Sequence, residues 1–301
     1  MTNSSEAPSL DVVIPCFNCG AVLERCVRSI LSSAEQCPGV RNVVIVDGGS
    51  SDDTAQVCER LGRLPRVQML RHEQSSASAK RNHAARWSQA DFLVFTDPDC
   101  VATEGWLAAY AEAARVWRCC TGRVSPYGCG VHTSVRGYRQ DHTFQPGILY
   151  RAFPFRPGSS NNVMIERALF TALGGFREDV GPGTPHDAGE DADLNYRVLR
   201  AGVPIRYVAQ AEVQHDHAET EAVFLRKKES YARGLSYLLF RFYPADPATY
   251  LSFKVMMAHT LLRLAWHALT FNRLKTRQAW GELRGRLRGA LEACQAWGKE
   301  H

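Results

Sequence analysis

The chain has 301 residues, of which 45% are hydrophobic and 22% charged, a globular composition that excludes wholesale disorder. Its formal net charge of +5 is too small to indicate a nucleic-acid-binding protein, so we expect no nucleic acid partner. The positive charge is concentrated at the C-terminus, where the last 51 residues carry nine Lys and Arg side chains against three acids. The preceding 250 residues are therefore close to neutral.

The N-terminal sequence MTNSSEAPSL lacks the positive segment and the apolar core of a secretory signal. The sequence contains no run of 18 uncharged apolar residues, so a transmembrane helix is not predicted. Without a secretory signal or such a helix, we expect a cytoplasmic protein. The ten cysteines are unevenly spaced and do not indicate a disulfide framework, so most are expected to be buried free thiols. Cys16 and Cys19 form a CxxC motif, a weak indication of zinc or redox chemistry without a second pair.

The first hundred residues alternate short apolar strands with amphipathic helices. The predicted strands cover 11–15, 43–46, 67–70 and 92–95, and the predicted helices cover 22–33, 53–61 and 77–87. Continuous apolar strands separated by such helices indicate a parallel sheet covered on both faces. Ligands bind such sheets at the carboxyl ends of the strands, and these ends read PCFN, DGGS and TDPD here.

The second part of the chain is less regular. A helix is predicted over 105–118, whereas 121–160 is rich in Gly, Pro and Tyr and has little periodicity, which indicates a long loop that is either functional or mobile. Order returns with a strand over 162–165, a helix to about residue 173, a helix over 191–201 and a strand over 205–208.

The C-terminal sequence predicts two further helices with unusual faces. In 251–271 the polar residues form one narrow stripe on an otherwise apolar helix: His259, Arg263, His267 and Thr270. The next helix carries an apolar stripe opposed by Arg277, Arg284 and Arg288: Trp280, Leu283, Leu287, Leu291, Cys294 and Trp297. Two interpretations stay open: the helices pack on the rest of the protein, or they lie in a membrane interface with their cations against anionic headgroups.

Two strand ends carry side chains suited to a ligand. Asp97 and Asp99 follow a buried strand directly and could hold a divalent ion together with substrate phosphates, although Asp and Pro are also common in solvated turns. The loop that begins at Asp47 contains two glycines, which let backbone approach a ligand. It lacks the lysine of a P-loop and the G-x-G-x-x-G spacing, so neither an ATPase nor a dinucleotide-binding protein is indicated.

Two later motifs add an acid pair and histidines. Glu190 and Asp191 open a helix, where acids complement the helix dipole and where a carboxylate could also act as a general base. His215 and His217 end an extended segment, and either could complete a metal site, although two histidines alone are a weak zinc signal.

Taken in order, these motifs resemble a family 2 glycosyltransferase of the GT-A fold. The resemblance rests on DVVIPCFN, DGGSSDDT, AKRNHAA, FTDPDC, SSNNVMIERALFTALGGFRED, GEDADLNYRVLRAG and a following histidine, from about residue 10 to 217. It implies an α/β, Rossmann-like, mostly parallel sheet flanked by helices, with a C-terminal helical extension. The implied divisions are a catalytic domain over 8–220, with a nucleotide-binding half (8–100) and an acceptor half (101–220), and a basic helical tail over 221–301.

The resemblance also implies an activity: metal-dependent transfer, with inversion, of a sugar from a nucleoside diphosphate donor to an acceptor hydroxyl. Lipid-linked and polysaccharide acceptors both stay open, and so does peripheral attachment to the inner face of a membrane. By matching position, the donor-binding residues would be Pro15, Phe17, Asn18, Asp47, Arg81, Asp97, Asn162 and Gly175. Mn²⁺ or Mg²⁺ would be held by Asp97, Asp99 and His215. Asp191 would be the general base, with Glu190 beside it.

Two departures from the family pattern leave donor specificity open. The segment 74–80, which leads to Arg81 and Asn82, lacks the glycine that many family members have there. The loop over 177–189 carries extra Gly and Pro. A sugar nucleotidyltransferase is an alternative, but the loop after the first strand lacks the Gly-rich, Arg- and Lys-bearing character which that class uses. A catalytically silent, membrane-associated GT-A scaffold is a second alternative.

Overall fold

The computed structural model describes residues 7–73, 76–128, 137–216 and 220–298. Its strands are β1 (Leu10–Cys16), β2 (Val40–Asp47), β3 (Val67–Arg71), β4 (Phe92–Thr96), β5 (Cys100–Ala102), β6 (Cys119–Pro126), β7 (His142–Phe144), β8 (Asn162–Glu166) and β9 (Ile205–His215). Its helices are α1 (Gly20–Glu35), α2 (Thr54–Leu61), α3 (Ala77–Trp87), α4 (Trp106–Ala113), α5 (Ile148–Ala152), α6 (Arg167–Ala172), α7 (Glu190–Arg200), α8 (Glu221–Phe242), α9 (Pro247–Leu269) and α10 (Arg273–Trp297).

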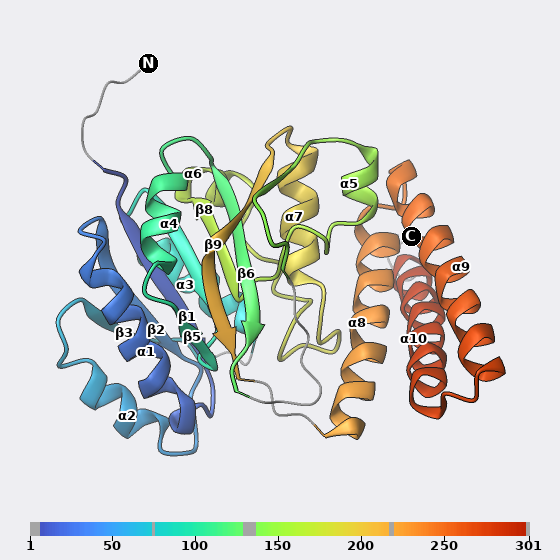
Figure 1. The fold of residues 1–301 in the computed structure, drawn as a ribbon, viewed down its shortest axis with the longest axis horizontal. Coiled ribbons are helices and arrows are strands. Elements are labelled where there is room, and N and C mark those ends of the chain that lie inside the picture. Colours follow the sequence, from blue (N-terminus) through green and yellow to red (C-terminus); the bar gives the residue numbers. More distant parts are fainter. Residues whose placement is uncertain (1–6, 74–75, 129–136, 217–219, 299–301) are drawn as a thin grey trace.

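The strands form one nine-stranded sheet in the order β3-β2-β1-β4-β8-β6-β9-β5, with β7 paired to β9. Helices lie on both faces of this sheet, and α8, α9 and α10 stand side by side at one end of the molecule (Figure 1). The predicted α/β class with a C-terminal helical extension is thereby confirmed.

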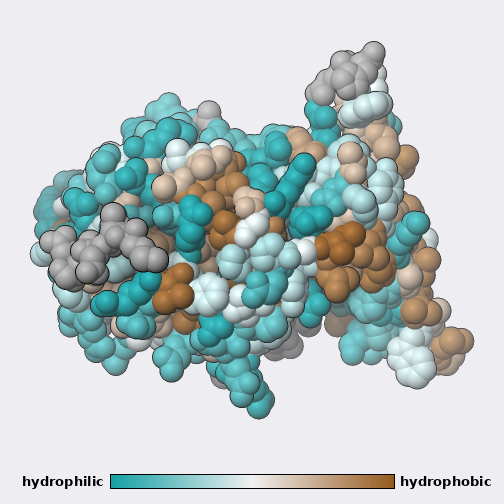
Figure 2. Space-filling view, turned by 90° about the horizontal axis from the view of Figure 1, so that it is seen from above, coloured by the Kyte–Doolittle hydropathy of each residue, from teal (hydrophilic) through white to brown (hydrophobic). Residues whose placement is uncertain are grey.

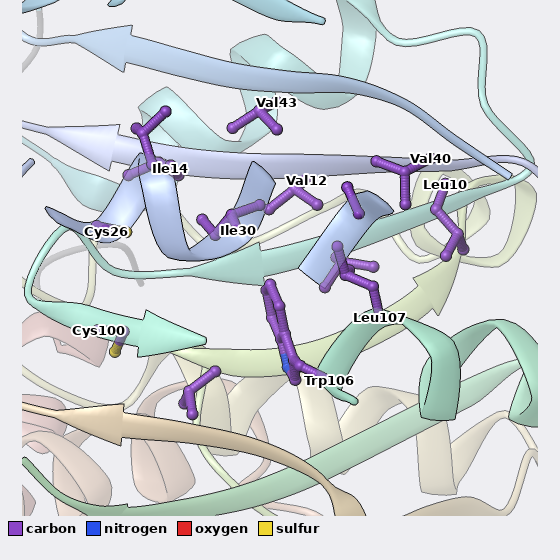
Figure 3. Packing of buried hydrophobic residues seen from close by; sticks show 14 of the residues in the cluster. Leu10, Val12, Ile14, Cys26, Ile30, Val40, Val43, Cys100, Trp106 and Leu107 are labelled. Atoms are coloured by element: carbon purple, nitrogen blue, oxygen red, sulfur yellow. The ribbon is translucent and has the colours of Figure 1, made fainter. Parts of the chain in front are cut away.

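The N-terminal half is the parallel sheet that the apolar strands predict. β1 lies between β2 and β4, and all three run parallel, with β3 parallel to the outer edge of β2. Because successive strand residues point to opposite faces, Val12 and Ile14 pack under α1 and α4 while Val13 joins the cluster on the other face. Trp106 at the start of α4 is fully buried in the first cluster (Figure 3).

The second half of the sheet is mixed rather than parallel. β8 runs antiparallel to β4 and to β6, whereas β6 runs parallel to β9. The long loop predicted over 121–160 is wrong in part, because that stretch contains most of β6, all of β7 and the short helix α5. The β6 sequence has no strand periodicity of its own, and its place is fixed by pairing with β8 and β9, which are distant in sequence. The helix predicted over 105–118 is shorter, since α4 ends at Ala113, and the strand predicted over 205–208 extends to His215.

The C-terminal helices pack on the sheet domain through α8. Leu235, Leu238 and Leu239 of α8 share a buried cluster with Ala192 and Tyr196 of α7. This cluster joins residues on both sides of the domain boundary predicted at residue 220. That boundary stays a prediction. None of the helices in the ranges given above is both long and apolar enough to cross a bilayer.

The packing of α10 on α8 uses small residues rather than the predicted apolar stripe. A Cβ added at Gly285 would lie 2.4 Å from the carbonyl oxygen of Glu229, and one at Gly289 would lie 2.1 Å from that of Arg233. Only glycine allows the two backbones to approach so closely. Of the predicted stripe, Leu283 is buried, whereas the following large side chains are exposed: Trp280, Leu287, Leu291 and Trp297. Apart from Leu283, these stripe residues therefore do not serve as the packing face of α10.

Candidate active site

The loops after β1 and β2 interlock at the carboxyl edge of the sheet. The Asn18 amide N–H donates to Ser50 Oγ at 2.9 Å, and the Ser51 N–H donates to Asn18 Oδ1 at 2.8 Å. Asn18 has a φ of +49°, a left-handed conformation that asparagine tolerates better than most residues. Ser50 Oγ donates to Asp47 Oδ1 at 2.6 Å. The structure thus brings the predicted Asn18 and Asp47 together at one corner of the sheet.

A disulfide joins Cys16 and Cys19 across this corner. The pair therefore departs from the free thiols expected for most cysteines, while six of the seven described free cysteines are buried as expected. Within the same turn, Pro15 is buried in β1 and Phe17 is 48% exposed. An exposed aromatic ring at a strand end offers a face on which a planar base can stack.

Lys80 lies beside this corner, and the sequence analysis did not single it out. It lies on α3 with its ammonium nitrogen 5.5 Å from the centre of the Phe17 ring. Burial and the charge of Arg81 lower the pKa of Lys80 to about 8, against the opposing charge of Asp47. The signal available was a lysine next to Arg81 at the start of a helix that follows a strand-end loop.

Arg81 links two of the predicted acidic motifs. Its guanidinium is 1% exposed and donates from Nη2 to Asp97 Oδ1 at 2.6 Å, and from Nη1 to Glu190 Oε1 at 3.5 Å. Ser160 Oγ also donates to Glu190 Oε1, at 2.9 Å. Arg81 therefore joins the end of β4 to the start of α7, and one oxygen of Asp97 is engaged by an arginine.

Asp99 and His215 meet through strand pairing. β5 runs antiparallel to β9 with Cys100 opposite His215, and this register places His215 Nε2 3.1 Å from Asp99 Oδ1. Ligand atoms of Asp99, Cys100 and His215 all lie within 4.8 Å of one another. Burial lowers the pKa of His215, but the hydrogen bond and charge of Asp99 and the charge of Asp97 raise it overall.

The donor set suits a hard divalent cation held by oxygen and nitrogen. Burial, with the charges of Asp97 and Asp99, raises the pKa of the Cys100 thiol well above its ordinary value. Carboxylate oxygen suits Mg²⁺ and Mn²⁺, whereas thiolate sulfur suits softer metals, so the Asp99 carboxylate and the His215 imidazole are the ligands that fit a hard cation. The alternative ligand His217 lies outside the described residues.

Glu190 and Asp191 occupy contrasting environments. Glu190 is 5% exposed, and burial together with the charge of Asp191 raises its pKa to about 7, against Arg81 and Ser160. Asp191 is half-buried, and its Oδ1 accepts from the Ala192 N–H at 2.7 Å in the first turn of α7. An acid in the first turn of a helix complements the helix dipole.

A cleft of about 1090 Å³ lies between the sheet edge and the C-terminal helices. The groups at the β1 and β2 corner do not line it, and neither does Arg81. The acids and the histidine occupy its inner wall: Asp97, Asp99, Glu190, Asp191 and His215. The opposite wall comes from α8 and α10, and its polar side chains include Arg226, Lys227, Lys228, Tyr231 and Arg286. The sequence did not predict that α8 and α10 line this cleft.

Asn162 is placed in the scaffold and does not line the cleft. Its side-chain Oδ1 accepts from Trp106 Nε1 at 2.8 Å and from the Tyr110 hydroxyl at 2.7 Å. Its Nδ2 donates to the carbonyl oxygens of Arg123 and Ala211, both at 2.8 Å. The residue is fully buried, with all four hydrogen bonds directed to protein. These contacts give Asn162 a structural role, and its assignment to donor binding stays a prediction.

Gly175 also has a structural role in the described residues, and its assignment to donor binding stays a prediction. It has a φ of +74°, and an added Cβ would lie 2.6 Å from Asn82 Oδ1. That oxygen accepts from the Phe176 N–H at 2.8 Å, and Asn82 Nδ2 donates to the Phe176 carbonyl at 2.8 Å. The glycine permits the turn that Asn82 closes, and it too is absent from the lining of the cleft.

An α/β sheet with acids and a histidine at its carboxyl edge is the arrangement of a GT-A glycosyltransferase. The mannosyltransferase PcManGT of Pyrobaculum calidifontis, solved with GDP-Man and Mn²⁺, has this fold with a TM-score of 0.60 and 16% identity, over 96% of this chain and 88% of that one. GalNAc-T7, solved with UDP, GalNAc and Mn²⁺, matches with a TM-score of 0.60 and 16% identity, over 80% and 49% of the two chains.

The chain belongs to glycosyl transferase family 2, whose profile matches residues 11–171. A pre-mycofactocin glycosyltransferase of Mycobacterium tuberculosis is 25% identical over 263 residues, 84% of this chain and 52% of the relative. Validoxylamine A glucosyltransferase of Streptomyces hygroscopicus subsp. limoneus is 29% identical over 234 residues, 67% and 50% of the two chains. The chain thus spans about half the length of these relatives.

Proposed function

We propose that this protein is a metal-dependent, inverting glycosyltransferase that moves a sugar from a nucleoside diphosphate donor to an acceptor hydroxyl. The observation that carries the proposal is the shared cleft, in which the Asp99–His215 pair and Asp191 line the same cavity. Family membership supports a sugar-transfer reaction. Neighbouring structures with nucleotide sugars and Mn²⁺ support the class of donor and cation.

Asp99 and His215 would hold the divalent cation, Mn²⁺ or Mg²⁺. Bound there, the cation would supply Lewis-acid stabilisation of the charge that develops on the departing nucleoside diphosphate. In this proposal Asp97, held by Arg81, orients the donor. Asp47, Asn18, Phe17 and Pro15 would form the nucleoside pocket at the neighbouring strand ends, as the family resemblance implies.

Asp191 is the proposed general base. Its carboxylate faces the cleft from the first turn of α7 and would take the proton of the acceptor hydroxyl as that oxygen attacks the anomeric carbon. Glu190 is buried against Arg81 and Ser160, so its proposed role is to position Arg81 and the start of α7 rather than to meet the acceptor.

The test is a panel of nucleotide sugars with Mn²⁺ or Mg²⁺, scored for released nucleoside diphosphate. We expect turnover with at least one donor, loss on chelation and recovery when the cation is restored. Asp191→Asn should keep nucleotide binding, measured by thermal stabilisation, and lose transfer. Asp187→Asn is the matched control, because Asp187 is an exposed acid lining the same cleft. Release of pyrophosphate instead would indicate a nucleotidyltransferase, and absence of both turnover and stabilisation would refute the proposal.

A further inference from the structure

The polar side of α9 faces the protein interior. Thr260 is fully buried and accepts from Arg286 Nε of α10 at 3.3 Å. Arg263 Nη1 donates to Glu282 Oε2 of α10 at 2.9 Å. Ser252, two turns earlier on the same side of the helix, is also fully buried. The packing side of this helix is therefore rich in polar residues. It overlaps the predicted polar stripe at Arg263 and the partly buried His267, whereas His259 and Thr270 are exposed.

The outward side of α9 is apolar. Val255, Leu262 and Leu269 recur every seven residues on one side of the helix and are 43%, 71% and 75% exposed. Neighbouring positions extend the surface, which we name the α9 face: Val255, Leu261, Leu262, Trp266, Leu269 and Phe271. Trp266 and Phe271 are 65% and 90% exposed. Figure 2 shows apolar surface over the C-terminal helices at the right of that view.

Positive charge surrounds the α9 face. Residues 247–281 contain five Lys and Arg and no acid. Lys254, Arg273 and Lys275 are exposed and make no ion pair within the described parts of the chain. Three later cations of α10 differ, because they pair with acids of the helical bundle: Arg277 with Glu221, Arg284 with Glu229 and Arg288 with Glu292.

We propose that the α9 face docks on an anionic lipid bilayer, lying in the interface plane. A helix rises about 1.5 Å per residue, so the stretch from Val255 to Phe271 offers a strip of roughly 24 Å. Leu, Trp and Phe on one face with cations beside them match the requirements for interfacial binding. Trp266 would sit at headgroup depth, where indole rings are favoured.

A second copy of the chain fits this surface less well. In a two-fold symmetric contact the same patch meets itself, so the cations of each copy would approach those of the other without an acid from 247–281 to compensate. Anionic headgroups supply the missing negative charge. Docking would also hold the cleft near the bilayer, since Arg286 bonds to α9 and lines the cleft.

The apolar part of the proposal is tested by flotation of the full chain with vesicles of phosphatidylcholine mixed with phosphatidylglycerol. We expect Leu262→Ser combined with Trp266→Ser to abolish binding. Val116→Ser combined with Trp87→Ser is the matched control, because these exposed side chains lie outside the C-terminal helices, and it should bind as the parent does. Thermal melting establishes that both double variants fold.

The electrostatic part is tested on the same vesicles and on pure phosphatidylcholine, which should bind the parent far more weakly. Each cation near an anionic surface contributes about fivefold in affinity, so Arg273→Gln with Lys275→Gln should weaken binding by roughly 30-fold. Arg63→Gln with Arg115→Gln changes the net charge equally and should leave binding unchanged. The proposal is overturned if the parent does not bind, if the α9 double variant binds as the parent does, or if the parent is a dimer that the same variant dissociates without vesicle binding. The flotation assay measures vesicle binding alone, so its outcome is independent of nucleotide-sugar turnover.

Discussion

Replacing Arg81 by methionine should destabilise the protein through one buried acid in particular. The guanidinium is 1% exposed and lies 2.6 Å from Asp97 and 3.5 Å from Glu190. Asp97 is 29% exposed, so water can solvate it after the change, whereas Glu190 is 5% exposed. Removing one partner of a buried ion pair costs about 3–5 kcal/mol, because the remaining charge is left unpaired. Glu190 can avoid this full cost by taking up a proton, which costs about 1.4 kcal/mol for each pH unit above its parent pKa of about 7. We therefore expect Arg81→Met to lower the free energy of unfolding by about 1–2 kcal/mol at pH 8.

The pH dependence separates this explanation from simple loss of packing. The pKa of Glu190 is raised from an ordinary value of 4.5 to about 7. Between those values the folded protein holds a proton that the unfolded chain has released, so stability falls as the pH rises through that window. Without the Arg81 guanidinium, the pKa of Glu190 in the folded protein rises further, and the pH range over which stability falls extends upward. The penalty of Arg81→Met should therefore be smaller at pH 5 than at pH 8.

The measurement is urea unfolding of the parent, Arg81→Met, Glu190→Gln and the double variant at both pH values. Glutamine cannot ionise, so Glu190→Gln should flatten the decline in stability with rising pH and remove much of the Arg81→Met penalty. A loss below about 1 kcal/mol at pH 8, or an equal loss at the two pH values, would refute the role assigned to the ion pair.

Two further predictions concern packing and are also read by urea unfolding. Gly289→Ala adds a Cβ 2.1 Å from the Arg233 carbonyl oxygen, so we expect a loss of about 2 kcal/mol despite the better helix propensity of alanine. Gly281→Ala is its control, because the nearest atom is 3.6 Å away, and it should gain up to about 1 kcal/mol; equal effects of the two would contradict the packing. Asn162→Leu leaves the buried Trp106 indole N–H without its acceptor, so we expect a loss of about 3 kcal/mol, and a loss below about 1 kcal/mol would argue against this role.

The parallel half of the sheet could be predicted because its signal is local. In β1, β2 and β4, uninterrupted apolar residues are buried on both faces, and the intervening helices carry apolar residues at helical spacing. β6 could not be predicted in this way. It contains Gly122, where an added Cβ would lie 2.1 Å from the Ala211 carbonyl oxygen and 2.4 Å from the Asn162 amide nitrogen. Its strand state comes from pairing partners distant in sequence, which a local pattern does not contain.

The candidate site divides in the same way. Asp97, Asp99 and Asp191 could be singled out because acids at a strand end and a helix start are visible in the sequence. The approach of His215 to Asp99 depends on the β5–β9 register, and the Arg81–Glu190 contact depends on how α3 meets α7. Neither contact follows from spacing along the sequence. The hydrogen bonds of Asn162 with Trp106 and Tyr110 likewise join residues more than 50 positions apart, so a local pattern does not contain them.

The C-terminal helices show what amphipathic spacing leaves undecided. A stripe of apolar residues identifies two faces of a helix but not which face meets the protein. In α9 the narrow polar side pairs with α10 through Arg263 and Thr260, so the broad apolar side turns outward. In α10 the packing side consists of Gly285, Gly289 and similar small residues, which carry little hydrophobic signal. The two interpretations of the tail were therefore not exclusive: one surface of the helical pair packs on the protein, and the other is left for the bilayer that we propose.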